Sequence, residues 1–341
     1  TKPKALLFQT ILEEQAEALR DLLPAQQLYS IDEAAILSTS FDQFIDEDYS
    51  LLTEPQPGVD EGWMIIPTAA VDRIPKGALL SQRNVMASAA VHLQHFGREA
   101  INGHLLALPI FHVMGLTSAW ATFISGGKNV LLKQFEEKLA VQLIDAEQLT
   151  YFGSFPPVLE RVLDSAKESG SGLESLKLVY GLEGPQNIQR LHEETSAVFW
   201  TGFGQSETTA FVTASPAAER PGASGQATLL NTVAVVDEID QQLPCGEEGE
   251  IVVRGENIFL EYWEMPEATA YAQRNSWHHT GDIGRFDEDG YLWYVKRKAE
   301  KELIKTGGEN VYPGEVENVL LKHPEINECC VIGVPDKTWG E

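Results

Sequence analysis

The chain has 341 residues, of which 43 % are hydrophobic and 22 % charged, a composition ordinary for a globular protein with a substantial core. Twenty-five basic and 51 acidic residues leave a formal net charge of −26, and such a field repels nucleic acid and anionic membrane surfaces. No run of about 18 apolar residues predicts a membrane-spanning helix, and three cysteines without metal-ligand spacing argue against a disulfide scaffold and favour a reducing, cytoplasmic setting.

The first 180 residues alternate short apolar segments with amphipathic ones. Strands are predicted over residues 5–8, 63–67, 105–108, 129–132, 151–152 and 176–180. Helices are predicted over residues 11–23 and 81–96, where apolar residues recur at helical spacing. Alternation of this kind favours a mostly parallel sheet with helices on its faces.

After about residue 223 the pattern changes to short β-rich segments separated by turns. Strands are predicted over residues 232–236, 249–253 and 258–262, and Asp289-Gly290 between aromatic-rich flanks predicts a hairpin over 286–294. Near Lys301 the pattern changes again. A helix over 313–323, opened by a proline, and a strand over 329–334 indicate the start of a small α+β domain that is incomplete at Glu341.

Four segments in a fixed order carry a family resemblance. Residues 108–115 read LPIFHVMG, 201–208 read TGFGQSET, 277–282 read WHHTGD and 304–317 read IKTGGENVYPGEVE. Together they resemble the adenylate-forming (AMP-binding) superfamily, which includes acyl-CoA synthetases, firefly luciferase and peptide-synthetase adenylation domains. An ordered set of four motifs is far more specific than any one of them.

The resemblance implies a fold and a domain division. The fold class would be α/β: an acyl-CoA synthetase-like large domain, layered α/β with a β-rich subdomain, plus an incomplete α+β C-terminal domain. Residues 1–300 would form the core of the adenylation domain without its usual first segment, and 301–341 would begin the small domain. Residues 301–302 fall near the hinge about which that domain rotates in the family, and a lysine that contacts the acid there lies beyond residue 341.

Residues 201–208 supply the groups that a nucleotide site needs: an aromatic face for adenine, a hydroxyl for phosphate and a carboxylate for Mg²⁺. The resemblance assigns adenine binding to Phe203 with Gly204, phosphate binding to Ser206 and the metal to Glu207. Taken alone, the same segment also fits a glycine turn followed by a helix cap.

Three further residues are assigned by the same resemblance. Asp282 would accept hydrogen bonds from both ribose hydroxyls, a role that suits an acceptor-only carboxylate; the alternative is a turn aspartate. Arg297 would contact the ribose or the phosphates. His112, at a strand-to-helix junction, would lie near the acyl group, and the alternative is a core histidine behind a buried strand.

Two loops match the family less well. Residues 180–185 read YGLEGP where the family has a glycine-rich adenine loop, so Gly181, Leu182 and Glu183 are candidate adenine contacts. Residues 67–77 read PTAAVDRIPKG at the phosphate loop, where Thr68 and Lys76 remain as donors but the usual serine, threonine and glycine cluster is missing. This change is compatible with a slow enzyme, a subfamily variant or a nucleotide binder that activates no acid.

The expected function is that of an AMP-forming acyl-CoA synthetase with ATP, Mg²⁺ and CoA as cofactors. A small-molecule carboxylic acid would be activated to acyl-AMP and transferred to the CoA thiol, with Ser206, Glu207, Lys76 and His112 as the catalytic candidates. Activity is expected to be impaired in a chain shortened at both ends. The alternatives are an adenylation domain that loads a carrier protein, and a catalytically weak nucleotide-binding relic.

Overall fold

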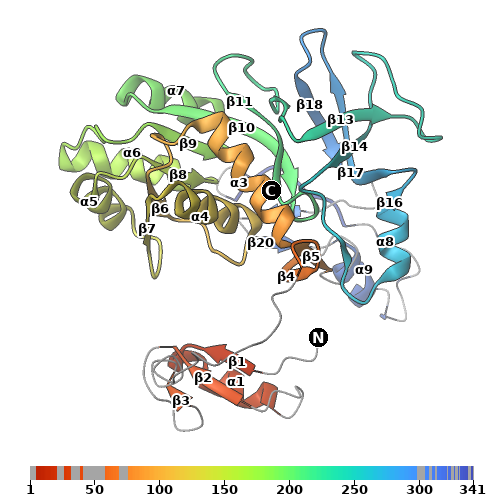
Figure 1. The fold of residues 1–341 in the computed structure, drawn as a ribbon, viewed down its shortest axis with the longest axis horizontal. Helices are drawn as coiled ribbons and strands as arrows, with labels where there is room; N and C mark the ends of the chain where they lie inside the picture. The colour runs from red at the N-terminus through yellow and green to blue at the C-terminus, as the bar shows by residue number, and fades with distance from the viewer. Residues whose placement is uncertain are drawn as a thin grey trace. The chain divides into compact units, whose positions relative to one another are not determined.

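A computed structural model describes residues 5–20, 27–31, 39–40, 58–68 and 76–297 and, nearer the C-terminus, 304–306, 309–311, 313–320, 322–323, 326, 329, 331–336 and 339–340 (Figure 1). Contacts divide the chain into two compact units, Thr1–Pro57 and Gly58–Glu341. The boundary expected at residue 300 lies within the second unit and stays a prediction. No helix of the described ranges is both long and apolar enough to cross a membrane.

The first unit contains a small parallel sheet in the order β1 (Ala5–Phe8), β2 (Gln27–Ser30), β3 (Thr39–Ser40). Between β1 and β2 the chain forms a 3₁₀ turn, η1 (Thr10–Leu12), and the helix α1 (Glu13–Arg20), which packs Ala16 against Phe8. The strand expected over residues 5–8 is confirmed. The helix expected from residue 11 begins two residues later, and its last three predicted residues lie outside the described ones.

A seven-stranded sheet dominates the second unit, in the order β12-β11-β10-β9-β8-β6-β7. Its strands are β6 (Gly103–Leu106), β7 (Lys128–Leu131), β8 (Tyr151–Ser154), β9 (Leu178–Gly181), β10 (Val198–Gln205), β11 (Ala210–Pro216) and β12 (Gln226–Ala227). The five neighbouring strands β7, β6, β8, β9 and β10 are parallel, β11 pairs antiparallel with β10, and β12 pairs antiparallel with β11. The mostly parallel sheet is therefore confirmed, with strand ends shifted by up to two residues.

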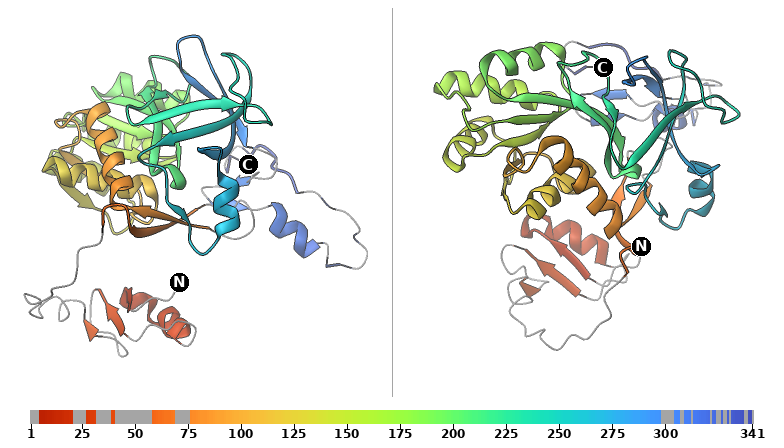
Figure 2. Two further views of the ribbon diagram at one scale, coloured as in Figure 1. Left: turned by 45° about the vertical axis from the view of Figure 1, so that its right-hand side comes forward. Right: turned by 45° about the horizontal axis from the view of Figure 1, so that its top comes forward.

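Helices cover both faces of this sheet (Figures 1 and 2). They are α3 (Gln82–Phe96) and α4 (Val113–Ser125) on one face, and α5 (Glu137–Glu147), α6 (Val158–Ser169) and α7 (Pro185–Glu194) on the other. Successive strand residues point to opposite faces, so Tyr151 enters the core under α3 and α4 while Phe152 enters the core under α5 to α7. This is the three-layer arrangement that the sequence predicted.

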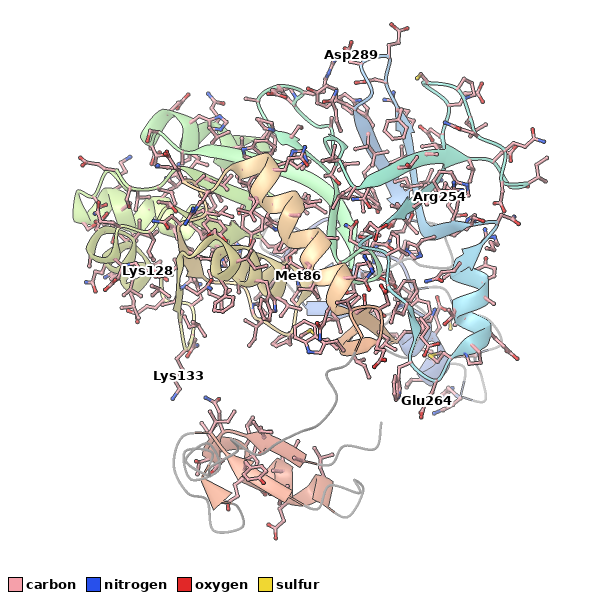
Figure 3. The ribbon with its side chains drawn as sticks, viewed as in Figure 1. Met86, Lys128, Lys133, Arg254, Glu264 and Asp289 are labelled. Atoms are coloured by element: carbon pink, nitrogen blue, oxygen red, sulfur yellow. The ribbon has the colours of Figure 1, made fainter. Side chains whose placement is uncertain are left out.

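The β-rich subdomain is an antiparallel sheet ordered β13-β14-β17-β16, with β18 also paired to β17. Its elements are β13 (Asn231–Val236), β14 (Gly249–Gly255), α8 (Pro266–Ala272), β16 (Gln273–Arg274), β17 (Trp277–Phe286) and β18 (Leu292–Arg297). The predicted hairpin joins β17 to β18, with Asp289 at its tip (Figure 3). Asp287 accepts hydrogen bonds from the N–H groups of Asp289 and Tyr291 and from the Trp293 indole, which accounts for this acidic turn structurally.

Two smaller sheets complete the unit. One runs β15-β5-β4, from β4 (Gly62–Pro67), β5 (Gly77–Ser81) and β15 (Glu261–Tyr262); the other pairs β19 (Ile304–Thr306) with β20 (Glu309–Val311), followed by α9 (Pro313–Leu320). The strand predicted over 258–262 is too long, because the N–H of Phe259 bonds instead to the Glu207 carbonyl. The strand predicted over 329–334 is wrong, since its described residues have no strand partner among the described segments.

Candidate functional site

Three of the predicted site segments follow the carboxyl ends of parallel strands. The chain leaves β9 into residues 181–183 and leaves β10 into a 3₁₀ turn, η2 (Ser206–Thr208). Beyond β6 it turns at 107–112 before α4 begins. In open α/β sheets ligands bind at this edge, because neighbouring parallel strands all deliver their following loops to it.

The base of the phosphate loop is closed by a two-way contact between Thr68 and Lys76. The Thr68 N–H donates to the Lys76 carbonyl at 2.8 Å, and the Lys76 N–H donates to Thr68 Oγ1 at 3.2 Å. Ser206 Oγ lies 3.5 Å from the carbonyl oxygen of Pro67, so η2 sits beside the same loop base. Residues 69–75, which carry the changed loop sequence, lie outside the described residues, and the effect of that change stays a prediction.

Glu207 is buried at the start of η2. Tyr262 donates its hydroxyl to Glu207 Oε1 at 2.6 Å, and the Phe259 N–H donates to the Glu207 carbonyl at 2.8 Å. No described residue donates a hydrogen bond to the second carboxylate oxygen, Oε2. The Lys76 ammonium lies 4.9 Å from the centre of the Tyr262 ring, so the phosphate-loop lysine and the carboxylate share one neighbour.

Asp282 and Arg297 face each other directly across β17 and β18. Asp282 is 4 % exposed, with Oδ1 3.5 Å from Arg297 Nε and Oδ2 accepting from Gln205 Nε2 at 2.5 Å. Gln205 also donates to the Thr280 carbonyl at 2.9 Å, which ties the end of β10 to β17. A carboxylate offers about four acceptor sites, the kind of group that can take hydrogen bonds from ribose hydroxyls.

Two groups beside Asp282 carry donors that suit an anionic ligand. Arg297 Nη1 is buried and has no hydrogen-bond partner among the described residues, a situation that costs about 1–3 kcal/mol unless a ligand fills it. Burial, and secondarily the Asp282 carboxylate, raise the pKa of Tyr294 to about 12. Its phenol therefore stays protonated at neutral pH and can donate a hydrogen bond.

Phe203, the predicted adenine platform, is largely enclosed between its own sheet and the β-rich subdomain. It is 8 % exposed, packs with Val212 and Ile251, and lies nearly parallel to the Tyr294 ring with centroids 6.4 Å apart. Tyr294 itself is 43 % exposed, so it is the more accessible ring of the pair. At the next residue, Gly204, an added Cβ would overlap the Ala210 carbonyl oxygen, which explains the glycine.

His112 lies at the N-terminus of α4, after the turn that follows β6. His112 is exposed, accepts the Met114 N–H at 3.3 Å as the N-cap of α4, and meets the Phe155 ring edge-on at 6.1 Å. Its exposure contradicts the alternative of a buried core histidine. Its predicted place near the acyl group stays a prediction.

The loop after β9 holds the one buried carboxylate among its three candidate adenine contacts. Glu183 is 9 % exposed and accepts from Ser154 Oγ at 2.6 Å and Asn187 Nδ2 at 3.3 Å. Burial raises its pKa, against the lowering effect of these donors. Gly181 has φ 139°, and an added Cβ would overlap the Ser154 carbonyl oxygen, while Leu182 is 55 % exposed.

A buried charged network supports the irregular stretch of β17 that carries Asp282. Glu250 Oε1 accepts the Gly281 N–H at 3.0 Å, and Oε2 contacts His279 Nδ1 at 3.0 Å and Arg274 at 3.3 Å. Asp240 lies 3.7 Å from both His279 Nε2 and Arg274 Nε. These residues therefore fix the backbone on the N-terminal side of Asp282.

Sequence reasoning did not give roles to Gln205, Tyr262 and Glu250. Gln205 lies between two motif residues, and the other two belong to the segments GEIVVRG and YW, which also match the family pattern. Their position in the motifs was the available signal. Their partners are distant in sequence, however, so only the fold reveals what they contact.

The side chains at the site fit Mg²⁺ better than a metal held entirely by protein ligands. No group of three or more His, Cys, Asp or Glu side chains that could hold a metal occurs within the described ranges. Mg²⁺ is usually held by one or two carboxylates together with phosphates and water. Glu207, with Oε2 available beside the phosphate-loop base, meets that requirement.

Two shallow hollows lie on other surfaces of the described part. One, of about 300 Å³, lies beside α6 and α7 around Leu163 and Thr195. The other, of about 220 Å³, lies beside the β17–β18 hairpin around Val235 and Cys245. Neither contains a predicted site residue, so the motif residues rather than these hollows define the candidate site.

The chain belongs to the family of AMP-binding enzymes. The family matches residues 2–263, and its C-terminal domain matches residues 315–341. The layered fold and the motif residues at the carboxyl edge of the sheet thus agree with the family that the sequence indicated.

Particular relatives are acyl-CoA ligases. The chain is 32 % identical to a feruloyl-CoA synthase of Amycolatopsis over 290 residues, covering 83 % of this chain and 59 % of the relative. It is 30 % identical to an indoleacetate–CoA ligase of Aromatoleum aromaticum, covering 99 % of this chain and 68 % of the relative. The chain thus spans about three fifths to two thirds of the length of these two relatives.

Solved structures give the same result for the fold. A putative long-chain-fatty-acid CoA ligase from Rhodopseudomonas palustris superposes with a TM-score of 0.82 at 36 % identity, covering 86 % of this chain and 74 % of that one. An amide bond synthetase from Marinactinospora thermotolerans superposes with a TM-score of 0.85 at 27 % identity, covering 99 % of this chain and 68 % of that one. The predicted fold class is confirmed.

Proposed function

We propose that the protein activates a carboxylic acid with ATP and transfers the acyl group to the thiol of CoA. The observation that carries this proposal is the convergence of Asp282, Arg297, Gln205 and Glu207 with the phosphate-loop base at one edge of the sheet. The similarity to feruloyl-CoA and indoleacetate–CoA ligases supports CoA as the acceptor. The match to the family of AMP-binding enzymes supports an AMP-forming reaction.

The reaction would proceed in two steps. A carboxylate oxygen of the acid attacks the α-phosphorus of ATP, which forms the acyl–phosphate bond of acyl-AMP and expels pyrophosphate. The CoA sulfur then attacks the acyl carbonyl and expels AMP, and the thiol proton is lost to solvent. The first step brings two anions together, so neutralising the phosphate charge is the main demand on the site.

The residues of the chain would divide this work among them. Glu207 would hold Mg²⁺, which supplies charge neutralisation on the phosphates when it is bound. Ser206, Thr68 and Lys76 would donate to the phosphates from the loop base. Asp282 would accept from the ribose hydroxyls, and Arg297 would donate to the ribose or phosphate through Nη1, which has no hydrogen-bond partner in the described part of the chain.

The adenine base and the acid have proposed positions as well. Phe203, Gly204 and the residues 181–183 would surround adenine, with the accessible ring of Tyr294 as an added face. His112 would lie near the acyl group. The identity of the acid is left at the class of small carboxylic acids, and a cytoplasmic setting is proposed from the sparse cysteines.

More than one molecule could accept the acyl group in the second step. The amide bond synthetase from Marinactinospora thermotolerans has the same fold, which means that different acceptors can be served by this scaffold. Loading of a carrier protein, the alternative from the sequence, would change only the thiol that accepts the acyl group. CoA is preferred because both curated relatives above are CoA ligases by name.

The test is nucleotide binding to the chain by titration calorimetry. AMP, and ATP with Mg²⁺, are titrated into the wild type and into Asp282→Ala, with Asp145→Ala as control because Asp145 is exposed on α5. We expect both nucleotides to bind, Asp282→Ala to abolish or strongly weaken binding, and the control to bind as the wild type does. A folded wild-type chain that binds neither nucleotide would contradict the proposal.

A further inference from the structure

Tyr262 occupies a position where three parts of the proposed site meet. Its backbone lies in β15, which pairs with β5, so that Tyr262 stands opposite Ala78 just after the phosphate loop. The next N–H, that of Trp263, donates to the Gly77 carbonyl at 2.8 Å. The tyrosine is thus attached to the strand that leaves the phosphate loop, and Glu264 marks the turn that follows it (Figure 3).

On one side Tyr262 holds the carboxylate proposed to bind the metal. Its hydroxyl donates to Glu207 Oε1 at 2.6 Å, and both residues are buried, at 3 % and 7 % exposed. A short hydrogen bond to a buried carboxylate restricts rotation of the carboxylate plane. Oε1 accepts the phenol, and no described residue donates a hydrogen bond to Oε2.

On the other side Tyr262 contacts the cation of the phosphate loop. Lys76 Nζ lies 4.9 Å from the ring centre, within the distance at which an ammonium is attracted to an aromatic face. The same lysine closes the loop base with Thr68. One side chain therefore contacts both the proposed phosphate donor and the proposed metal ligand.

We infer that Tyr262 is a positioning residue that fixes Glu207 as a one-oxygen ligand for Mg²⁺ and sets its spacing from Lys76. This inference rests on the proposed function. Without the hydroxyl, the buried carboxylate can turn, and its orientation must be restored each time a metal–nucleotide complex binds. The metal-dependent part of ATP binding should then weaken more than the metal-free part.

The experiment compares ATP affinity with and without Mg²⁺ by calorimetry. For each protein the measured quantity is the dissociation constant for ATP in EDTA divided by that in saturating Mg²⁺. We expect this ratio to fall about tenfold in Tyr262→Phe, the size expected for losing a hydrogen bond to a charged group, while metal-free binding stays unchanged. Tyr262→Leu, which also removes the ring under Lys76, should weaken metal-free binding as well.

The matched control is Tyr271→Phe, which removes a hydroxyl from an exposed tyrosine on α8. It should keep the wild-type ratio, and thermal unfolding should show all variants folded. An unchanged ratio in Tyr262→Phe, or a larger one, would overturn the inference, because the hydroxyl would then be neutral or a competitor of the metal. A wild-type protein that binds no nucleotide would instead contradict the proposed function. A wild-type protein that binds ATP equally well with and without Mg²⁺ would contradict the assignment of Glu207 as the metal ligand.

Discussion

At the scale of single residues, the site is built from polar groups whose partners are far away in the sequence. Gln205 reaches Asp282 across 77 positions, and Tyr262 reaches Glu207 across 55. Motif matching identified Asp282 and Glu207 because their residue types are distinctive. It gave no role to Gln205 or Tyr262, because a glutamine or tyrosine reveals its partner only after strands pair.

Glu183 shows a second limit of residue-level prediction. The sequence placed an acidic residue in the glycine-rich loop predicted to bind adenine, but it did not predict that the carboxylate would accept from the neutral side chains of Ser154 and Asn187. Ser154 and Asn187 stabilise the charge only partly, since burial has the larger effect and raises the pKa. The ionised form is therefore less favourable in the folded protein than in the unfolded chain.

The pKa shift of Glu183 predicts how Glu183→Gln changes stability with pH. A raised folded-state pKa stabilises the fold below the usual glutamate value of 4.5, and this stabilisation is lost as pH rises through the pKa of the folded state. Glu183→Gln removes that dependence. The unfolding free energy of the variant relative to wild type should therefore increase as pH rises from 4.5 toward neutrality.

The measurement is urea unfolding of both proteins across that pH range. Exposed Glu160 on α6 provides the control, Glu160→Gln, whose difference from wild type should vary less with pH. A difference between Glu183→Gln and wild type that stays constant with pH would contradict an elevated pKa.

At the scale of elements, features that depend on one segment were predicted better than features that depend on contacts between segments. The Asp289-Gly290 turn fixed the β17–β18 hairpin, and the hairpin register then placed Asp282 opposite Arg297. The strand expected over 258–262 was too long, because residues 259 and 260 donate to Glu207 and Leu79 outside a regular ladder. Apolar alternation cannot distinguish these two bonding patterns.

The irregularity at the middle of β17, where its pairing with β14 shifts register, gives the prediction at this scale. Glu250→Gln removes the charge that faces Arg274 and His279 and weakens the hold on the Gly281 N–H. We expect a loss of about 1–3 kcal/mol in unfolding free energy, the usual result when hydrogen bonds to a buried charge are lost. AMP affinity should fall too, because Asp282 follows directly after Gly281, whose N–H Glu250 binds.

Urea unfolding and AMP calorimetry test both effects. Exposed Glu248, two residues earlier, offers the control Glu248→Gln, which should retain stability and affinity. If Glu250→Gln lost stability but bound AMP with wild-type affinity, the network would support the sheet without orienting Asp282.

At the scale of the whole molecule, the layer arrangement followed from the sequence because alternating strands and helices permit few packings. Tyr151 and Phe152, adjacent in β8, serve opposite cores, so one strand specifies both helix layers. The sequence did not predict that ionisable groups would also enter these layers. His92 and His104 are each 1 % exposed.

These buried histidines predict how the molecule responds to acid. Burial lowers the pKa of His92 and of His104 from 6.5 to about 4. A depressed histidine pKa stabilises the folded state above 6.5, and the stabilisation is lost as pH falls toward 4, because the unfolded chain binds the proton first. Between neutral pH and about pH 5.5, each histidine should account for a loss of about 1 kcal/mol.

His92→Gln isolates one of these contributions, because glutamine can still donate to the Ser88 carbonyl but does not titrate. The variant is expected to be less stable than wild type at neutral pH through poorer packing against Tyr180 and Phe211. Its unfolding free energy should nevertheless fall by about 1 kcal/mol less than that of wild type on acidification to about pH 5.5. His323→Gln, at an exposed position, is the control and should follow the wild-type curve more closely. Parallel curves for His92→Gln and wild type would mean that His92 is already protonated in the fold, or that water reaches it.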